Sequence, residues 1–227
     1  MAYTFRGGSH VSEHKNTRRS PIRRLDPPAQ VAIPLAQHIG APCTPLVKVG
    51  DRILRGQKIG DGEGLCVPVH ASVSGTVVAI EPRPHTNGRM VNAIVIENDL
   101  RDDTVELKGN HTPLAQLEDD DILHAIREAG IVGMGGAAFP GNVKALSAMG
   151  NVDTLIANAC ECEPYITADD SLLRTAVEDV ISGMRILGDL LHAGRMVIAV
   201  EDNKKEAIAA VRQLLKNDPE IQLQVLP

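Results

Sequence analysis

Between residues 31 and 98 the chain alternates short apolar runs with glycine and aspartate. Short runs of this kind, bounded by turn formers, are typical of β-strands, whereas helices need longer periodic segments. The pattern therefore predicts a module of short strands joined by tight turns. The expected strands cover residues 46–51, 56–60, 69–80 and 93–97.

From Leu114 onward the pattern changes to an alternation of helices and strands. Four acidic residues, 118–121, mark the start of the first helix, where negative charge interacts favourably with the helix dipole. Alternation of helices and strands predicts a parallel sheet with right-handed crossovers. The expected elements are strands over 154–158, 196–200 and 222–226 and helices over 122–129, 171–192 and 207–215.

Residues 1–30 show no regular pattern, and three prolines interrupt any helix there. We expect a solvated basic arm packed on its own domain rather than a tail that binds a partner, because short charge runs usually face water. The predicted organisation is α/β, with the arm (1–30), a β module (31–112) and a parallel α/β domain (113–227). The basic residues of the arm are Lys15, Arg18, Arg19, Arg23 and Arg24.

Composition excludes several classes of protein. A formal net charge of −6 argues against nucleic acid as the main partner. No apolar run approaches the roughly 20 residues of a membrane-spanning helix, and the N-terminus has no apolar signal core, which predicts a cytoplasmic chain. Cysteine spacing includes no Cys-x-x-Cys pair, so reduced thiols and neither a zinc nor an iron–sulfur site are expected. The cysteines are Cys43, Cys66, Cys160 and Cys162.

Five glycines fall within residues 130–141, just after a helical run. Such a loop can bring backbone N–H groups close to a flat or anionic ligand. Pro140 sets a new turn, and a short helix is expected to open near Val143 and Lys144, with its N-terminus and the ammonium group favouring a phosphate. The spacing matches neither the phosphate-binding P-loop nor the dinucleotide-binding glycine turn. A purely structural turn between two helices is the alternative.

The strand predicted over 154–158 runs directly into the acidic, sulfur-containing segment 159–165. In open α/β sheets ligands bind outside the carboxyl ends of strands, so this segment is a candidate site. Two of the four aromatic residues, Phe139 and Tyr165, fall in the two candidate segments. There a planar ring can stack on a flavin or nicotinamide; the alternative is that both rings fill the core.

Both segments resemble the flavin and NADH site in the flavoprotein subunit of respiratory complex I. The closer resemblance is to the C subunits of bacterial Rnf complexes, and it covers essentially the whole chain. The shared motifs comprise the glycine loop with its lysine, Gly133 to Pro140 and Lys144, and the run Asn158 to Pro164, together with Phe5 to Gly8, Ile33 to Gly40, Pro68 to Gly75 and Glu201 to Lys204.

The β module also resembles the folded core of lipoyl and biotinyl carrier domains. Those domains carry their prosthetic group on a lysine at a hairpin tip, but the corresponding hairpin here, Gly60 to Val67, contains no lysine. The resemblance therefore implies a structural or docking barrel-sandwich and not a swinging-arm carrier.

The resemblance to the Rnf and complex I proteins implies a Rossmann-like domain that binds FMN and NADH. Phe139 would stack on the nicotinamide, Lys144 would face phosphate, and Glu163 would lie on the nicotinamide side of NADH. Acids at the end of the next strand suit ribose hydroxyls. FMN would lie against Gly133, Gly135, Gly136 and Ala137, with Asn158 and Glu161 at its polar edge and Glu201 or Asp202 on the ribose. Two departures from the complex I pattern are Met134 in place of an arginine and Cys160 in place of an aspartate.

The function implied is that of an FMN-dependent, NADH-oxidising electron-input subunit. It would pass electrons between NADH and ferredoxin within a complex that moves Na⁺ or H⁺, together with membrane-bound and iron–sulfur subunits, on the cytoplasmic side of the bacterial membrane. The family continues into a tail with two [4Fe–4S] clusters. We therefore expect this chain to be the N-terminal part of a longer protein, truncated within the FMN domain, and to hold little FMN and no iron by itself.

Two other functions are considered. One is an architectural role like that of the A subunit in the sodium-pumping NADH:quinone reductase, and the other is a pure docking module with an empty glycine loop. Intact glycines at 133, 135 and 136 favour the flavin function.

Overall fold

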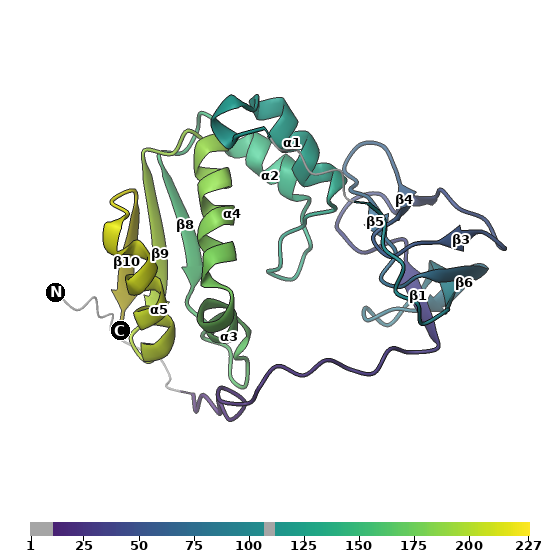
Figure 1. Ribbon diagram of the computed structural model, residues 1–227, viewed down its shortest axis with the longest axis horizontal. Coiled ribbons are helices and arrows are strands. Elements are labelled where there is room, and N and C mark those ends of the chain that lie inside the picture. The colour runs from purple at the N-terminus through teal and green to yellow at the C-terminus, as the bar shows by residue number, and fades with distance from the viewer. Residues whose placement is uncertain (1–10, 107–111) are drawn as a thin grey trace. The chain divides into compact units, whose positions relative to one another are not determined.

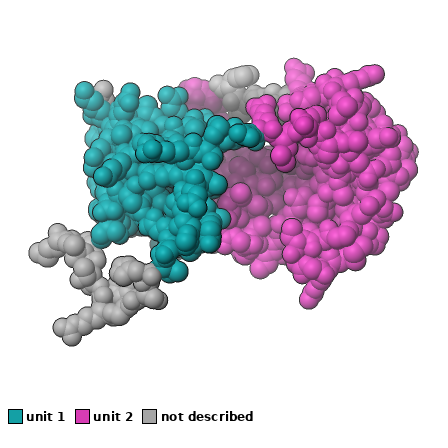
Figure 2. Space-filling model, turned by 90° about the horizontal axis from the view of Figure 1, so that it is seen from below, with its two compact units in different colours: residues 1–23, 148–227 teal, residues 24–147 magenta. Residues whose placement is uncertain are grey.

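The computed structural model describes residues 11–106 and 112–227, which form two compact units (Figures 1 and 2). The barrel unit comprises Arg24–Ser147, and the parallel-sheet unit comprises Met1–Arg23 together with Ala148–Pro227. These limits differ from the predicted boundaries at 30/31 and 112/113, because the first helices of the predicted α/β domain group with the β module. The domain boundaries themselves stay a prediction.

Two antiparallel sheets enclose the core of the barrel unit, which confirms the predicted barrel-sandwich. The core contains the fully buried side chains of Ile53, Ile59, Val77, Ile94 and Ile96. One sheet has the order β1-β7-β6-β3 and the other the order β2-β4-β5. The strands are β1 (Gln30–Pro34), β2 (Thr44–Pro45), β3 (Arg52–Ile53), β4 (Lys58–Asp61), β5 (Val69–His70), β6 (Gly75–Pro84) and β7 (Met90–Asn98).

Two of the predicted strands differ from the structure. Residues 46–51 form a turn instead of a strand: Gly50 has a φ of +92°, and the Asp51 carboxylate accepts the Lys48 N–H at 2.9 Å. The expected strand over 69–80 is divided into β5 and β6, because β5 pairs with β4 in one sheet and β6 with β7 in the other. A chain that changes sheets has to leave the strand conformation at the bend.

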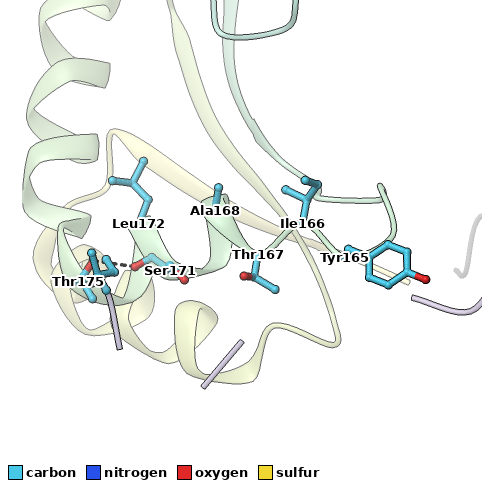
Figure 3. Close-up of a pocket in the computed structure, with 8 residues that line it drawn as sticks. Tyr165, Ile166, Thr167, Ala168, Ser171, Leu172 and Thr175 are labelled. Carbon is cyan, nitrogen blue, oxygen red and sulfur yellow. Dashed lines mark hydrogen bonds between the residues drawn. The ribbon is translucent and has the colours of Figure 1, made fainter. Parts of the chain in front are cut away.

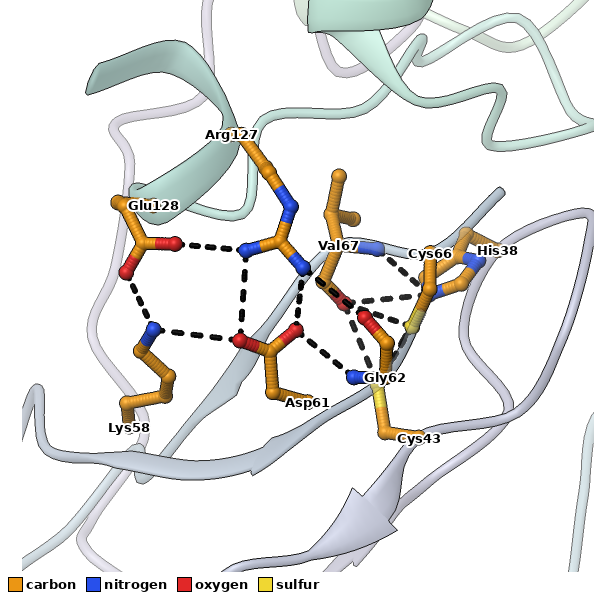
Figure 4. A network of polar contacts seen from close by, with 9 residues as sticks. All are labelled: His38, Cys43, Lys58, Asp61, Gly62, Cys66, Val67, Arg127 and Glu128. Carbon is orange, nitrogen blue, oxygen red and sulfur yellow. Dashed lines mark hydrogen bonds and ion pairs between the residues drawn. The ribbon is translucent and has the colours of Figure 1, made fainter. Parts of the chain in front are cut away.

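Helix α1 (Asp119–Glu128) begins at Glu118 with three acidic residues in its first turn and ends at Gly130, which has a φ of +68°; both ends were predicted. The short 3₁₀ helix η1 (Leu114–Gln116) precedes it. The last turn of α1 is joined to β4 by ion pairs. Arg127 donates to Asp61 at 2.7 Å, and Glu128 pairs with Lys58 (Figure 4).

This charge network makes the stability of the barrel unit depend on pH. Burial opposes ionisation of Asp61, but hydrogen bonds from Arg127, Gly62 and Lys58 together hold its pKa below the ordinary value. The hydrogen bond from Lys58 likewise lowers the pKa of Glu128. Carboxylates with depressed folded-state pKa values stabilise the fold above their unfolded pKa, and that stabilisation is lost as pH falls through the folded pKa.

We therefore expect the stability of the barrel unit to fall below about pH 4. Asp61→Asn should lower the free energy of unfolding at pH 7 by about 1–2 kcal/mol, between the values of exposed and buried ion pairs. The variant should also show a weaker acid dependence in urea titrations at pH 7 and pH 3. Glu63→Gln, an exposed acid two residues away, is the control. Equal urea unfolding curves for Asp61→Asn and Glu63→Gln would contradict the stabilising role of the Asp61 carboxylate.

The parallel-sheet unit has the strand order β10-β9-β8, with both pairings parallel, as the alternation of helices and strands predicted. Helix α4 packs against β8 and β9, and α5 against β10 (Figure 1). The elements are β8 (Thr154–Ala159), α3 (Ala168–Thr175), α4 (Val177–Leu190), β9 (Arg195–Glu201), α5 (Lys205–Leu214), the 3₁₀ helix η2 (Leu215–Asn217) and β10 (Ile221–Leu226).

The single helix expected over 171–192 is two helices, so this prediction is wrong. The helix breaks at Ala176, whose φ of −144° and ψ of 37° are not helical. The Thr175 hydroxyl donates to the Ser171 carbonyl at 2.7 Å, a local bond that competes with helix continuation. Apolar residues continue at helical spacing across the break, with Leu173 before it and Ile181 after it in one core.

Part of the basic arm packs on the parallel-sheet unit. The Lys15 ammonium donates to three backbone carbonyls, which together form a carbonyl cage around it: those of Glu161, Glu163 and Ile166. Arg18 pairs at 3.2 Å with the buried carboxylate of Asp170. The expected packing on its own unit is confirmed for these two residues, while Arg19 and Arg23 are exposed. The first ten residues of the arm lie outside the described part of the chain. Within the described part, no helix has the length and apolar character needed to span a bilayer.

Candidate functional site

The glycine loop belongs to the barrel unit, and backbone hydrogen bonds close it at its base. Val132 forms an antiparallel bridge with Pro140, and the Gly133 N–H donates to the Phe139 carbonyl at 2.8 Å. Ile39 supports the loop from the β module by donating its N–H to the Ala137 carbonyl at 3.2 Å. The loop is thus held at its base and at Ala137.

The tip of the loop presents backbone donors to open space. A Cβ added at Gly135 or Gly136 would meet no atom within 4 Å, and Gly136 has a φ of +109° that only glycine adopts easily. Within the described residues, the N–H groups of Met134, Gly135 and Gly136 donate to no protein atom. These groups are free to donate to a ligand.

Helix α2 (Gly141–Ala148) starts directly after Pro140, two residues before the start predicted near Val143, and adds polar groups beside the loop. Lys144 is exposed and forms no ion pair with a described residue. In the first turn, the Asn142 side-chain oxygen is buried and accepts no hydrogen bond from a described residue. Asn142 was not among the predicted site residues, since a lone asparagine gives no sequence signal. An unpaired ammonium suits a phosphate, whereas an unpaired amide oxygen suits an N–H or O–H donor of a ligand.

Phe139 and Tyr165 are not core residues, because their exposed fractions are 37% and 64%. Phe139 closes the glycine loop with part of its ring accessible. Tyr165, in the parallel-sheet unit, stacks on His14 of the arm with ring centroids 5.0 Å apart. The alternative that both rings fill the core is therefore wrong.

Within the parallel-sheet unit, three predicted residues share the carboxyl edge of the sheet. Asn158 lies near the end of β8, and Glu201 ends the neighbouring β9, followed by Asp202. The side-chain oxygen of Asn158 accepts the Cys160 N–H at 3.1 Å. Burial and the nearby Glu201 carboxylate raise the pKa of the Cys160 thiol, which stays protonated at neutral pH.

Glu161 occupies a different environment, because it is only 2% exposed. Its carboxylate accepts the Asp169 N–H at 2.8 Å, at the start of α3, and lies 3.8 Å from the Lys15 ammonium. The structure therefore gives Glu161 a role in holding the segment after β8. Glu163 is exposed, and its carbonyl accepts a hydrogen bond from Lys15 at 2.8 Å. Its place beside a nicotinamide stays a prediction.

A groove of about 480 Å³ lies elsewhere in the parallel-sheet unit (Figure 3). Its lining combines Ile22 of the arm with residues of the segment before α3 and of α3 itself, including Tyr165, Ile166 and Leu172. No charged side chain lines it, so it offers no positive charge to a phosphate group.

Two sets of residues carry groups that suit FMN. One set is the glycine loop of the barrel unit, and the other is the carboxyl edge of the sheet in the parallel-sheet unit. The glycine loop supplies open backbone donors, a free ammonium and an orphan amide oxygen, which suit a flat heterocycle with a phosphate. The edge of the sheet supplies amide and carboxylate groups, which suit the polar edge of a ring or ribose hydroxyls. Glycine content alone also allowed a structural turn, but the unused donors and the space around them favour a ligand site.

Comparisons with known proteins agree with this assignment. Residues 3–101 match the RnfC barrel sandwich hybrid domain, and residues 126–227 match the Nuo51 FMN-binding domain. The chain is 41% identical over 223 residues to the C subunit of the Na⁺-translocating ferredoxin:NAD⁺ oxidoreductase complex of Acetobacterium woodii, covering 97% of this chain and 50% of that protein. It is 41% identical over 229 residues to the C subunit of the ion-translocating oxidoreductase complex of Haemophilus influenzae, covering 99% of this chain and 35% of the relative.

Among solved structures, one chain of an NAD⁺-reducing [NiFe]-hydrogenase aligns with a TM-score of 0.41 and 21% identity, over 48% of this chain and 21% of its own length.

A barrel-sandwich joined to an FMN-binding domain defines the class of flavin-dependent oxidoreductase subunits. The chain belongs to the C-subunit family of Rnf-type ion-translocating oxidoreductases. It spans between about a third and half the length of these curated relatives.

One group of reactive side chains was missed by the sequence analysis. His38, Cys43 and Cys66 of the barrel unit converge, with their candidate ligand atoms all within 4.8 Å of one another. No short motif predicts this, because the two cysteines are separated by 22 residues and meet only when the sheets fold.

Proposed function

We propose that the protein is the electron-input subunit of an Rnf-type complex, oxidising NADH with FMN and exchanging electrons with ferredoxin. The complex would couple this transfer to movement of Na⁺ or H⁺, with this subunit on the cytoplasmic side of the membrane and bound to membrane-embedded and iron–sulfur subunits. Two [4Fe–4S] clusters would be held outside these 227 residues, whose four cysteines lie two in each unit. Alone, these residues would not transfer electrons to ferredoxin.

The observation that carries the proposal is the open glycine loop with its unused donors, in a chain 41% identical to an Rnf-type relative. Bound FMN would supply the chemistry of accepting hydride from NADH and releasing single electrons. The loop N–H groups would orient the isoalloxazine and favour negative charge on it. Lys144 would pair with a phosphate, and Phe139 would stack on the nicotinamide. The loop would make both a binding and an electrostatic contribution.

The charged residues give a kinetic test in the intact protein. We expect Lys144→Ala and Glu163→Gln each to raise the KM for NADH more than they lower the FMN content. Removing a hydrogen bond to a charged group costs about 1.5–3 kcal/mol, so kcat/KM should fall roughly ten-fold or more.

Steady-state NADH oxidation with an artificial acceptor, together with FMN released by acid, measures both quantities. Lys48→Ala, an exposed lysine on a turn of the β module, is the control and should leave both unchanged. NADH kinetics unchanged in both site variants would exclude Lys144 and Glu163 from the NADH site.

A further inference from the structure

Three side chains from separate segments of the barrel unit meet beside the charge network of α1 (Figure 4). His38 follows β1, Cys43 precedes β2, and Cys66 lies between β4 and β5. The Sγ atoms of the two cysteines are 3.5 Å apart, and the His38 Nε2 lies 3.9 Å from Cys43 and 3.7 Å from Cys66. Both cysteines are buried, and His38 is half-buried, which leaves a route from solvent past the imidazole.

A fourth donor atom completes the group. The Val67 carbonyl oxygen lies 3.2 Å from the Cys43 sulfur, 3.2 Å from the His38 Nε2 and 3.8 Å from the Cys66 sulfur. All six distances among the four atoms therefore fall between 3.2 and 3.9 Å. A regular tetrahedron with edges of about 3.5 Å has its centre about 2.1 Å from each corner, within the range of zinc bonds to sulfur, nitrogen and oxygen.

Hydrogen bonding is compatible with the imidazole tautomer that a cation needs. The Ile39 carbonyl lies 3.1 Å from Nδ1 and the Val67 carbonyl lies 3.2 Å from Nε2, and both can only accept, so each tautomer has one carbonyl to donate to. In the tautomer protonated at Nδ1, which a bound cation would select, the Nε2 lone pair faces the sulfur atoms. Its one backbone donor, the Val67 N–H, is distant at 3.3 Å and is easily replaced by a cation. A ring N–H that donates to a backbone carbonyl is the usual support of a metal-bound histidine.

The surrounding backbone holds the two segments together and leaves room for the sulfur atoms. The Ala41 N–H donates to the Leu65 carbonyl at 3.1 Å. A Cβ at Gly40 would lie 2.1 Å from that same carbonyl oxygen, so only glycine allows this approach. A Cβ at Gly62 would lie 3.0 Å from the Cys66 sulfur. The nearby Asp61 carboxylate is paired with Arg127 and Lys58, so it does not compete as a ligand.

We propose that His38, Cys43 and Cys66 form a Zn²⁺ site in the barrel unit, with the Val67 carbonyl oxygen in the fourth position. Two thiolates and one imidazole are a donor set that Zn²⁺ prefers. On binding, each thiol gives its proton to solvent and forms a Zn–S bond, with no change of oxidation state. The ion would tie the segment after β1 to the segment before β5. Since Ile39 also bonds to Ala137, it would stiffen the support of the glycine loop.

The other cysteines of the chain provide a matched control. Cys160 and Cys162 lie in the parallel-sheet unit and contribute nothing to the group. The protein is purified under reducing conditions, stripped with a chelator, dialysed against Zn²⁺ and assayed for zinc by mass spectrometry. We expect one zinc per chain in the wild type and in Cys160→Ser/Cys162→Ser. Cys43→Ser/Cys66→Ser should retain none, and His38→Gln should bind more than about 100-fold more weakly.

Two further measurements distinguish loss of a zinc ligand from unfolding of the variant. Zinc-edge X-ray absorption should show two sulfur and two nitrogen or oxygen neighbours. Added Zn²⁺ should raise the Tm of the wild type and not that of the folded His38→Gln variant. Reduced wild-type protein that binds no zinc would overturn the proposal. So would equal zinc retention in the Cys43→Ser/Cys66→Ser protein, which would show an adventitious site elsewhere.

Discussion

Lys15→Met should lower the free energy of unfolding of the parallel-sheet unit by about 3–5 kcal/mol, the range for breaking a buried ion pair. The ammonium donates to the carbonyls of Glu161, Glu163 and Ile166 at 2.7, 2.8 and 2.7 Å. It also lies 3.8 Å from the Glu161 carboxylate, with side-chain exposures of 9% for Lys15 and 1% for Glu161. Methionine keeps the aliphatic length and removes the charge, so it leaves a buried carboxylate without its cation.

Denaturant titration measures this change, and hydrogen exchange over residues 159–169 shows where the unit loosens. Arg19→Met, in an exposed position of the same arm, should change stability by less than about 0.5 kcal/mol. Adding Glu161→Gln to Lys15→Met removes the uncompensated charge and should recover part of the loss. Equal stability of Lys15→Met and Arg19→Met would show that the cage contributes nothing.

Gly135→Val should weaken FMN binding by about 10–100-fold while the fold stays intact. A Cβ at Gly135 meets no protein atom within 4 Å, and the residue has no left-handed φ, so valine fits the ligand-free loop. Methyl groups placed against a bound isoalloxazine would cost about 1–3 kcal/mol, as in other overpacked contacts.

Gly136→Val is a less informative test of FMN binding than Gly135→Val, although Gly136 stands at the centre of the glycine loop. Its φ of +109° strains any side chain, so a loss of FMN there has two possible causes. Gly183→Val in α4 is the control, since a Cβ there also meets no atom within 4 Å. FMN content and circular dichroism report the outcome. Full FMN retention by a folded Gly135→Val protein would remove the flavin from this loop.

Much of the fold follows from local pattern. The strands and helices of the parallel sheet, the start of α1 and the helix after Pro140 all lie close to their predicted places. The break at Ala176 was not predictable, because apolar spacing reports which face is buried and stays continuous on both sides of it. The division between β5 and β6 depends on which sheet each strand joins, which is a long-range property.

In the candidate site, too, contacts between residues far apart in the sequence could not be predicted. Motif resemblance pointed to Glu161, but its burial depends on Lys15, 146 positions earlier in the chain. The arm was expected to be mostly solvated, and nothing local marks one lysine as enclosed by carbonyls. The His38, Cys43 and Cys66 group likewise forms only when both sheets of the barrel unit close around one core.

The flavin content of the freshly purified full-length protein that contains these 227 residues tests the central claim most directly. Absorbance spectra with acid release of the flavin should give close to one FMN per full-length wild-type protein, and markedly less in Gly135→Val at unchanged circular dichroism. A folded wild-type protein that purifies colourless, and takes up no FMN when the cofactor is added, would contradict the account.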